Sequence, residues 1–117
     1  MKRDKNTIVI DRSKWNCGGD IGPSSHGEGP TFLVNNEGYM CCLGFATHQI
    51  LRCKKSDLLH MPFPSAIMNK GKLLAIEYNA MQVNDNPDLS DKERESQIKG
   101  IFKRVGLKVK FKGKYNN

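Results

Sequence analysis

The sequence of 117 residues lacks the features that mark several common classes of protein. It contains no run of the roughly 20 apolar residues that a membrane-spanning helix needs, so we do not expect this chain to be an integral membrane protein. Residues 1–6 lack the apolar core of a secretory signal, so we expect a protein of the cytoplasm. No Gly-Lys-Ser/Thr triplet is present, which excludes a nucleotide-binding P-loop.

Acidic residues are missing from the C-terminal part of the chain. From Ile98 onward there are seven lysines and arginines and no aspartate or glutamate, whereas residues 1–90 are nearly balanced in charge. A field of one sign raises the local concentration of anionic partners. Nucleic acid, a nucleotide, an acidic protein surface and an anionic membrane all fit this charge, and a solvated tail that only aids solubility explains it as well.

Local patterns predict the secondary structure. Short β-branched or alternating runs are typical of strands, and apolar residues three or four apart are typical of helices. Residues 35–38 (Asn-Asn-Glu-Gly) separate two apolar runs and predict a β-hairpin, because Asn and Gly tolerate positive φ angles. Ser90 and Glu93 form a capping box at the start of the last helix. The expected strands are 7–10, 31–34, 39–42 and 107–112, and the expected helices are 43–51, 73–83 and 90–105.

These elements predict a single domain over residues 1–117. Its class is α+β, with a small, mostly antiparallel sheet and about three helices packed on one face of that sheet. Residues 16–30 contain five glycines and two prolines and are therefore expected to form a long loop. Residues 112–117 are expected to form a flexible basic tail. A loop of this length is usually functional or mobile, and its glycines are compatible with a phosphate-binding nest.

The last expected strand has two different faces, because side chains alternate along a strand. Lys108, Lys110 and Lys112 point away from the apolar residues between them and are expected to face solvent. Such lysines either attract an anionic partner or prevent the strand edge from pairing with another chain. Aromatic residues among lysines suit nucleic-acid binding, but the apolar pattern assigns Phe111 to the core and leaves Tyr115 as the free aromatic.

Four cysteines and three histidines are enough to build a zinc site, but their spacing is unusual. No Cys-x-x-Cys pair is present, and the adjacent Cys41 and Cys42 would point to opposite faces of a strand. A site made of Cys17, His26 and one of this pair stays open. The simpler hypothesis treats Cys41 and Cys42 as small apolar residues, one of them buried in the core, and we expect neither a metal nor a cofactor.

Cys42 is also a candidate nucleophile. It lies where a strand is expected to meet a helix, and a helix N-terminus lowers the pKa of a thiol. A cysteine hydrolase needs a histidine base held by a third polar group, and the downstream candidates are His48 and His60. His48 lies in the same expected helix and His60 in an irregular segment, so neither is well placed. We therefore expect no enzymatic activity.

Residues 33–45, which contain Cys-Cys-Leu-Gly, resemble a recurrent motif of small tailed-phage proteins that have no assigned function. In those proteins a hairpin ends in Cys-Cys-Leu-Gly and runs into a helix. The similarity extends to residues 8–15, to Asn84-Asp85 and to residues 89–94. It implies a phage accessory protein that acts in the cytoplasm of a bacterial host. Small phage proteins without catalytic motifs often work by binding, either to block a host defence complex or to sequester a nucleotide signal.

We therefore expect a non-enzymatic phage accessory protein that binds and interferes with a host partner, most directly an antiphage defence system. One alternative is a protein that binds a nucleotide signal or nucleic acid through its basic C-terminal face. A second alternative is a cysteine-dependent enzyme centred on Cys42. No membrane partner is expected. The expected contact residues are Lys103, Arg104, Lys108, Lys110 and Lys112, together with Gly18, Gly19, Ser24 and Ser25 of the loop.

Overall fold

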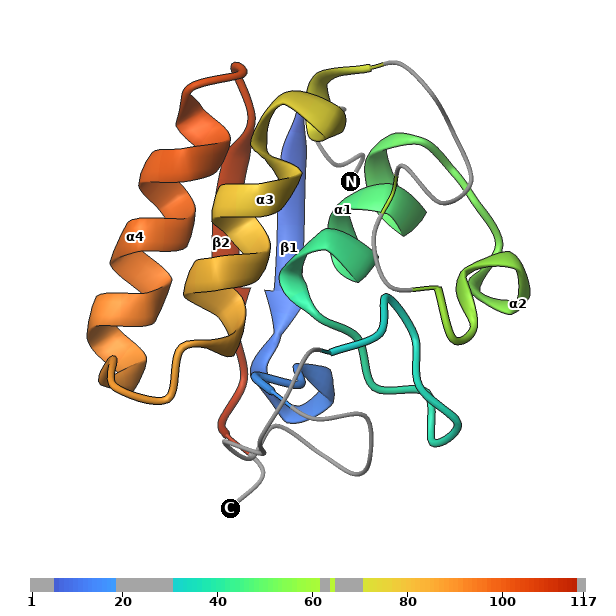
Figure 1. Cartoon of the computed structure of the whole chain (residues 1–117), viewed down its shortest axis with the longest axis horizontal. Coiled ribbons are helices and arrows are strands. Elements are labelled where there is room, and N and C mark those ends of the chain that lie inside the picture. Colours follow the sequence, from blue (N-terminus) through green and yellow to red (C-terminus); the bar gives the residue numbers. More distant parts are fainter. Residues whose placement is uncertain (1–5, 19–30, 62–63, 65–70, 116–117) are drawn as a thin grey trace.

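A computed structural model describes residues 6–18, 31–61, 64 and 71–115 (Figure 1). The described chain begins with a strand and a short 3-10 helix, continues through four α-helices and returns to a second strand. In chain order these elements are β1 (Thr7–Asp11), η1 (Arg12–Lys14), α1 (Cys42–Ile50), α2 (Lys55–Leu58), α3 (Lys72–Asp85), α4 (Asp91–Lys103) and β2 (Lys108–Lys112).

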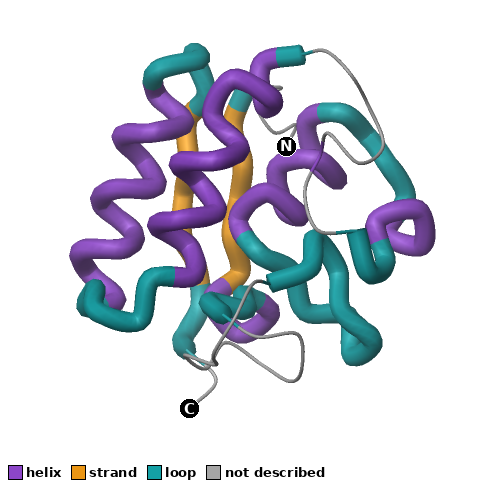
Figure 2. Tube along the Cα trace, viewed as in Figure 1, coloured by secondary structure: helices purple, strands orange, loops and turns teal. Residues whose placement is uncertain are grey.

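The sheet of the described residues consists of β1 and β2, and the two strands are parallel. In their register Thr7 lies beside Lys108 and Asp11 beside Lys112. The prediction of a mostly antiparallel sheet is therefore wrong, although the α+β class agrees with the structure. Two strands from opposite ends of the chain pair with each other, and all the helices lie in the connection between them (Figure 2).

The hairpin expected over residues 31–42 does not form, although its turn does. Asn35 N donates to Tyr39 O at 2.9 Å, and Gly38 adopts a φ of +86°. The segments on either side of the turn bond to other parts of the chain: Met40 N donates to Lys14 O at 2.9 Å, and Leu33 N donates to Met61 O at 2.7 Å. Single bridges therefore replace the expected ladder.

Helices α3 and α4 lie side by side in front of the two strands, and α1 packs beside β1 (Figure 1). The core fills the space between these helices and the sheet. Its fully buried side chains come from every layer, and each leucine, isoleucine or phenylalanine among them contributes about 1.5–3 kcal/mol relative to exposure. They include Ile8 and Ile10 of β1, Leu43 and Ala46 of α1, Leu73 and Ala80 of α3, and Ile98 and Phe102 of α4.

The connection between α3 and α4 is held by local hydrogen bonds. The capping box forms as expected, with Glu93 N donating to Ser90 Oγ at 3.1 Å and Ser90 N donating to Glu93 Oε1 at 3.0 Å. The buried Arg94 donates to the carbonyl oxygens of Asn86 and Leu89. These contacts close the turn and fix the start of α4 against the end of α3.

Helix α1 approaches the backbone of the preceding segment closely at Gly44. A Cβ atom built at Gly44 would lie 2.0 Å from the carbonyl oxygen of Leu33 and 3.0 Å from Met40 Cβ. Only glycine fits this position without moving the backbone. Gly44 therefore allows α1 to press against the turn segment that precedes it.

Candidate functional site

The expected lysine surface is present on β2. Lys108, Lys110 and Lys112 (the lysine row) are exposed, whereas Val109 between them is buried. Within the described part of the chain, none of the three lysines forms an ion pair. The lysine row therefore presents three positive charges, two residues apart, on one face of β2.

One carboxylate lies close to the lysine row, on the neighbouring strand. Asp11 is the register partner of Lys112, but its carboxylate accepts hydrogen bonds from the hydroxyl and the backbone N–H of Ser13, at 2.7 and 3.0 Å. The hydroxyl hydrogen bond holds the pKa of Asp11 below its usual range, and the charge of Lys112 lowers it further. Asp11 is thus a charged cap of η1 and neutralises the row only in part.

The aromatic residues near the C-terminus are held in a packed cluster. The ring centroid of Trp15 lies 5.1 Å from that of Phe111 and 6.1 Å from that of Tyr115. The guanidinium of Arg12 lies over the rings of Phe111 and Tyr115. It also forms a bidentate ion pair with Glu95, at 2.7 and 2.8 Å. The hydroxyl of Tyr115 also donates to Glu95. The prediction that Tyr115 is free is therefore wrong, because its ring and its hydroxyl are both engaged.

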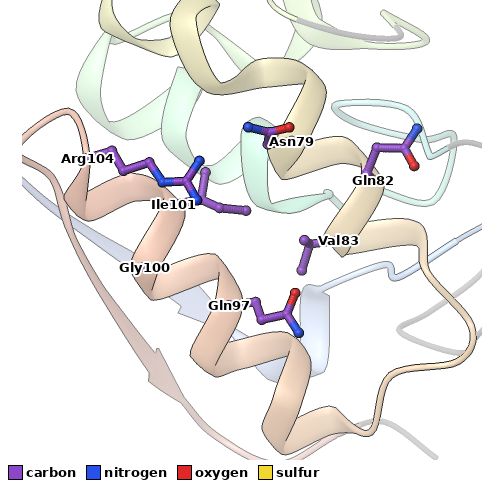
Figure 3. A pocket seen from close by; sticks show the side chains of 7 residues that line it. All are labelled: Asn79, Gln82, Val83, Gln97, Gly100, Ile101 and Arg104. Atoms are coloured by element: carbon purple, nitrogen blue, oxygen red, sulfur yellow. The ribbon is translucent and has the colours of Figure 1, made fainter.

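The structure separates Arg104 from the lysine row. Arg104 borders a groove of about 440 Å³ between α3 and α4 (Figure 3). The lysine row points away from these helices, because the alternate side chain Val109 packs on the core. The groove combines one guanidinium with three side-chain carboxamides above an apolar floor. Its lining residues are Asn79, Gln82, Val83, Gln97, Gly100, Ile101 and Arg104.

The other expected contact residues divide between described and undescribed parts of the chain. Lys103 is exposed at the last position of α4. Gly18 is buried, with a φ of +131°, a conformation that favours glycine. Gly19, Ser24 and Ser25 lie outside the described residues, as does His26 of the possible zinc site.

Cys42 lies at the N-terminus of α1, as expected, but its thiol is inaccessible. The side chain is fully buried, and Sγ lies 3.7 Å from the carbonyl oxygen of Ala80. Burial raises the pKa of Cys42 well above its usual value, and the same cause raises the pKa of Cys41 to about 12. Burial thus outweighs the helix N-terminus and opposes formation of the thiolate that catalysis requires.

The two histidines considered as bases have other partners. Nδ1 of His48 lies 2.8 Å from the carbonyl oxygen of Cys53, and Nε2 of His60 lies 2.7 Å from Asn36 Oδ1. Across the described residues, no three His, Cys, Asp or Glu side chains are grouped so that they could hold a metal ion. The cysteines and histidines of the described residues therefore form no cluster of this kind.

A buried polar cluster surrounds Asn84, at the end of α3, and the sequence alone does not predict it. Asn84 Oδ1 accepts from Trp15 Nε1 at 2.7 Å and from Cys42 N at 3.0 Å. Its Nδ2 donates to Asn16 O at 3.0 Å and to Asp85 Oδ1 at 2.8 Å. The sequence showed Asn84-Asp85 only as a helix stop, because the distant partners of a buried amide leave no local pattern.

The Asn84 cluster joins three segments that lie far apart in the sequence. Trp15, Cys42 and Asn84 belong to these three segments and meet at one amide oxygen. Asp85 extends the cluster, because its carboxylate accepts from Thr31 N at 3.2 Å and from Thr31 Oγ1 at 2.7 Å. The Asn84 cluster thus anchors α1 and the segment after β1 to α3.

No helix within the described residues is long and apolar enough to cross a membrane. Comparison of the chain with protein-family models, with curated proteins and with solved structures gives no match.

Proposed function

We propose that the protein is a non-enzymatic binding protein that docks the lysine row on an acidic surface of a host protein. In this proposal it acts as a phage accessory protein that interferes with antiphage defence. The observation that carries the proposal is the lysine row itself, which is exposed and has no ion-pair partner in the described chain. Charges held in fixed positions steer association and select complementary partners.

The packing of the aromatic residues favours a protein partner over nucleic acid. Proteins that bind single strands add exposed aromatic rings to a basic surface, and bases stack on those rings. Here Phe102 is buried, and Phe111 and Tyr115 pack against Trp15. The basic face therefore offers charge but no stacking platform among these three rings.

The test reverses the charge of the row in the variant Lys108→Glu/Lys110→Glu/Lys112→Glu. The matched control reverses three exposed lysines elsewhere, Lys54, Lys55 and Lys72. A partner is first captured from bacterial host lysate with the unmodified protein, and affinities are then measured by calorimetry.

The row variant should bind on the order of 100-fold more weakly, since three surface ion pairs and the new repulsion together amount to about 3 kcal/mol. The control should bind within about threefold of the unmodified protein, as expected for charges outside the interface. Circular dichroism confirms that both variants fold. Equal affinity of the row variant and the unmodified protein would refute the assignment of this surface.

The groove between α3 and α4 supports a second candidate function, binding of a small anionic ligand such as a nucleotide. Carboxamides both donate and accept hydrogen bonds, as recognition of a base requires, and a guanidinium binds phosphate. Native mass spectrometry of the protein purified from bacterial cells tests this function directly. A retained nucleotide that is lost in Arg104→Gln but kept in the row variant would favour the groove, and a bare polypeptide mass would remove this candidate.

A further inference from the structure

The two edges of the small sheet differ. The outer edge of β1 is closed by a side chain of α1: Gln49 Oε1 accepts from Val9 N, and Gln49 Nε2 donates to Val9 O, both at 2.8 Å. The carboxamide thus satisfies the backbone groups that a neighbouring strand would use. No further strand can join the sheet at this position.

The outer edge of β2 has no such cover in the described chain. Lys108 N donates to Asn6 O at 2.9 Å, so the lysines direct their backbone groups toward β1. Because these directions alternate along a strand, Val109 and Phe111 direct theirs outward. Within the described residues, no hydrogen bond to the outward groups of Val109 or Phe111 is found. An open edge of this kind is a template for an added strand.

Positive charge surrounds this open edge on two sides. The lysine row lines the face of the sheet that points away from the helices. On the other side, Lys99 of α4 reaches the strand, with Nζ 5.8 Å from the ring centroid of Phe111. Lys92 and Lys103 are exposed and lie seven and four residues from Lys99, which places them on the same flank of the helix.

The nearest carboxylates neutralise this edge only in part, because Asp11 interacts with Lys112 and Glu95 with Lys99. Glu95 of α4 is bound by Arg12 and Tyr115, and Asp11 of β1 is bound by Ser13. Both acids lie at the end of the sheet where β1 and β2 finish. The middle of the edge, around Lys110, therefore stays basic.

We propose that the open edge of β2 receives an extended acidic segment of the partner protein as a third strand. This inference rests on the proposed function and specifies how the partner binds. The backbone of the added segment bonds to the outward N–H and C=O groups of Val109 and Phe111. Its acidic side chains stand at alternate positions and face the lysine row, because neighbouring side chains on one face of a sheet lie within ion-pair reach.

The probe is an acetylated heptapeptide in which glutamate and valine alternate. Its matched control carries N-methyl groups on alternate residues, which remove the backbone donors of one edge and keep every charge. Binding is measured by NMR together with amide hydrogen exchange. The free protein should exchange the amides of Val109 and Phe111 quickly and that of Lys110 slowly, since only the last is bonded within the sheet.

With the peptide bound, exchange at Val109 and Phe111 should slow at least tenfold. The N-methylated peptide should bind at least tenfold more weakly, and Lys110→Glu should weaken binding of the unmodified peptide. Lys55→Glu, a distant exposed lysine, should leave its affinity unchanged.

Either of two results would overturn strand addition: binding that leaves both amides exchanging at their free rate, or equal affinity for the two peptides. Failure of the peptide to bind would overturn it as well, as would an oligonucleotide that binds this face in place of the peptide. In the first two cases an acidic partner still binds by charge alone, and the proposed function stands. The proposed function itself fails only if charge reversal of the lysine row leaves the host partner bound.

Discussion

Replacing Gly44 by alanine should destabilise the protein strongly. The added Cβ would lie 2.0 Å from the carbonyl oxygen of Leu33 and 2.9 Å from its carbonyl carbon, and since ordinary contacts begin at 3.4 Å, the backbone must move by more than about 1 Å. Rotation of a side chain cannot relieve this overlap, because the facing atoms belong to the backbone. Alanine favours the helix by at most about 1 kcal/mol. Overpacking typically costs about 1–3 kcal/mol, and an overlap with backbone atoms lies at or above the upper end of this range, so we expect a net loss of about 2 kcal/mol or more.

Gly100→Ala is the matched control. Gly100 also lies within a helix, but a Cβ added there would meet nothing within 4 Å, so only the gain in helix propensity remains. Thermal unfolding followed by circular dichroism and by the fluorescence of the single buried tryptophan measures both variants. Gly44→Ala should lower Tm by about 8 °C or more and Gly100→Ala should raise it by up to about 4 °C, at about 4 °C per kcal/mol. A Gly44→Ala protein as stable as the unmodified one would refute the argument from close approach.

Three further changes test the buried cluster, a carboxylate and the thiols. Asn84→Ala leaves buried donors without an acceptor and should lower the free energy of unfolding by about 3 kcal/mol in urea titrations, whereas the exposed Asn79→Ala should cost less than about 0.5 kcal/mol. Burial raises the pKa of Glu95, but hydrogen bonds from neighbouring side chains lower it more, so its net shift is downward. The ionised Glu95 therefore stabilises the fold above about pH 4.3, and this contribution is lost as the pH falls through the folded-state pKa. Glu95→Gln should flatten the fall in the free energy of unfolding between about pH 5 and pH 3, and an unchanged slope of this free energy against pH would contradict the argument. Iodoacetamide should modify the partly exposed Cys53 of the native protein first and Cys42 only on unfolding, as mapped by mass spectrometry; rapid reaction of Cys42 at pH 6 would revive the enzyme hypothesis.

Features of the fold that depend on neighbouring residues could be predicted from the sequence. The capping box at Ser90, the apolar stripes of α3 and α4 and the alternation along β2 all lie within a few residues of one another, and the structure confirms them. Strand pairing could not be predicted in this way. The turn at residues 35–38 indicated a hairpin, but Met40 and Leu33 bond to Lys14 and Met61 instead. A local turn does not determine which distant backbone groups its flanks will meet.

In the candidate site, too, only features that depend on neighbouring residues could be predicted from the sequence. Exposure of the lysine row follows from its alternation with apolar residues. The position of Arg104 in a groove and the anchoring of Tyr115 do not follow, because each depends on a neighbouring element that is remote in sequence. Cys42 illustrates a further limit. Its place at a helix start was predicted correctly, but burial, which sets its pKa, is a property of the assembled core.

The pairing of β1 with β2 sets the order of events during synthesis. About 100 residues separate the two strands, and a ribosome adds roughly 5–20 residues per second, so β1 waits on the order of 5–20 s for its partner. Until then Ile8 and Ile10 have no strand beside them and no completed core to enter. The nascent chain therefore exposes an apolar strand to chaperones, and the domain can finish folding only after β2 has left the exit tunnel. A chain truncated before β2 would keep that strand exposed and be a ready substrate for proteases.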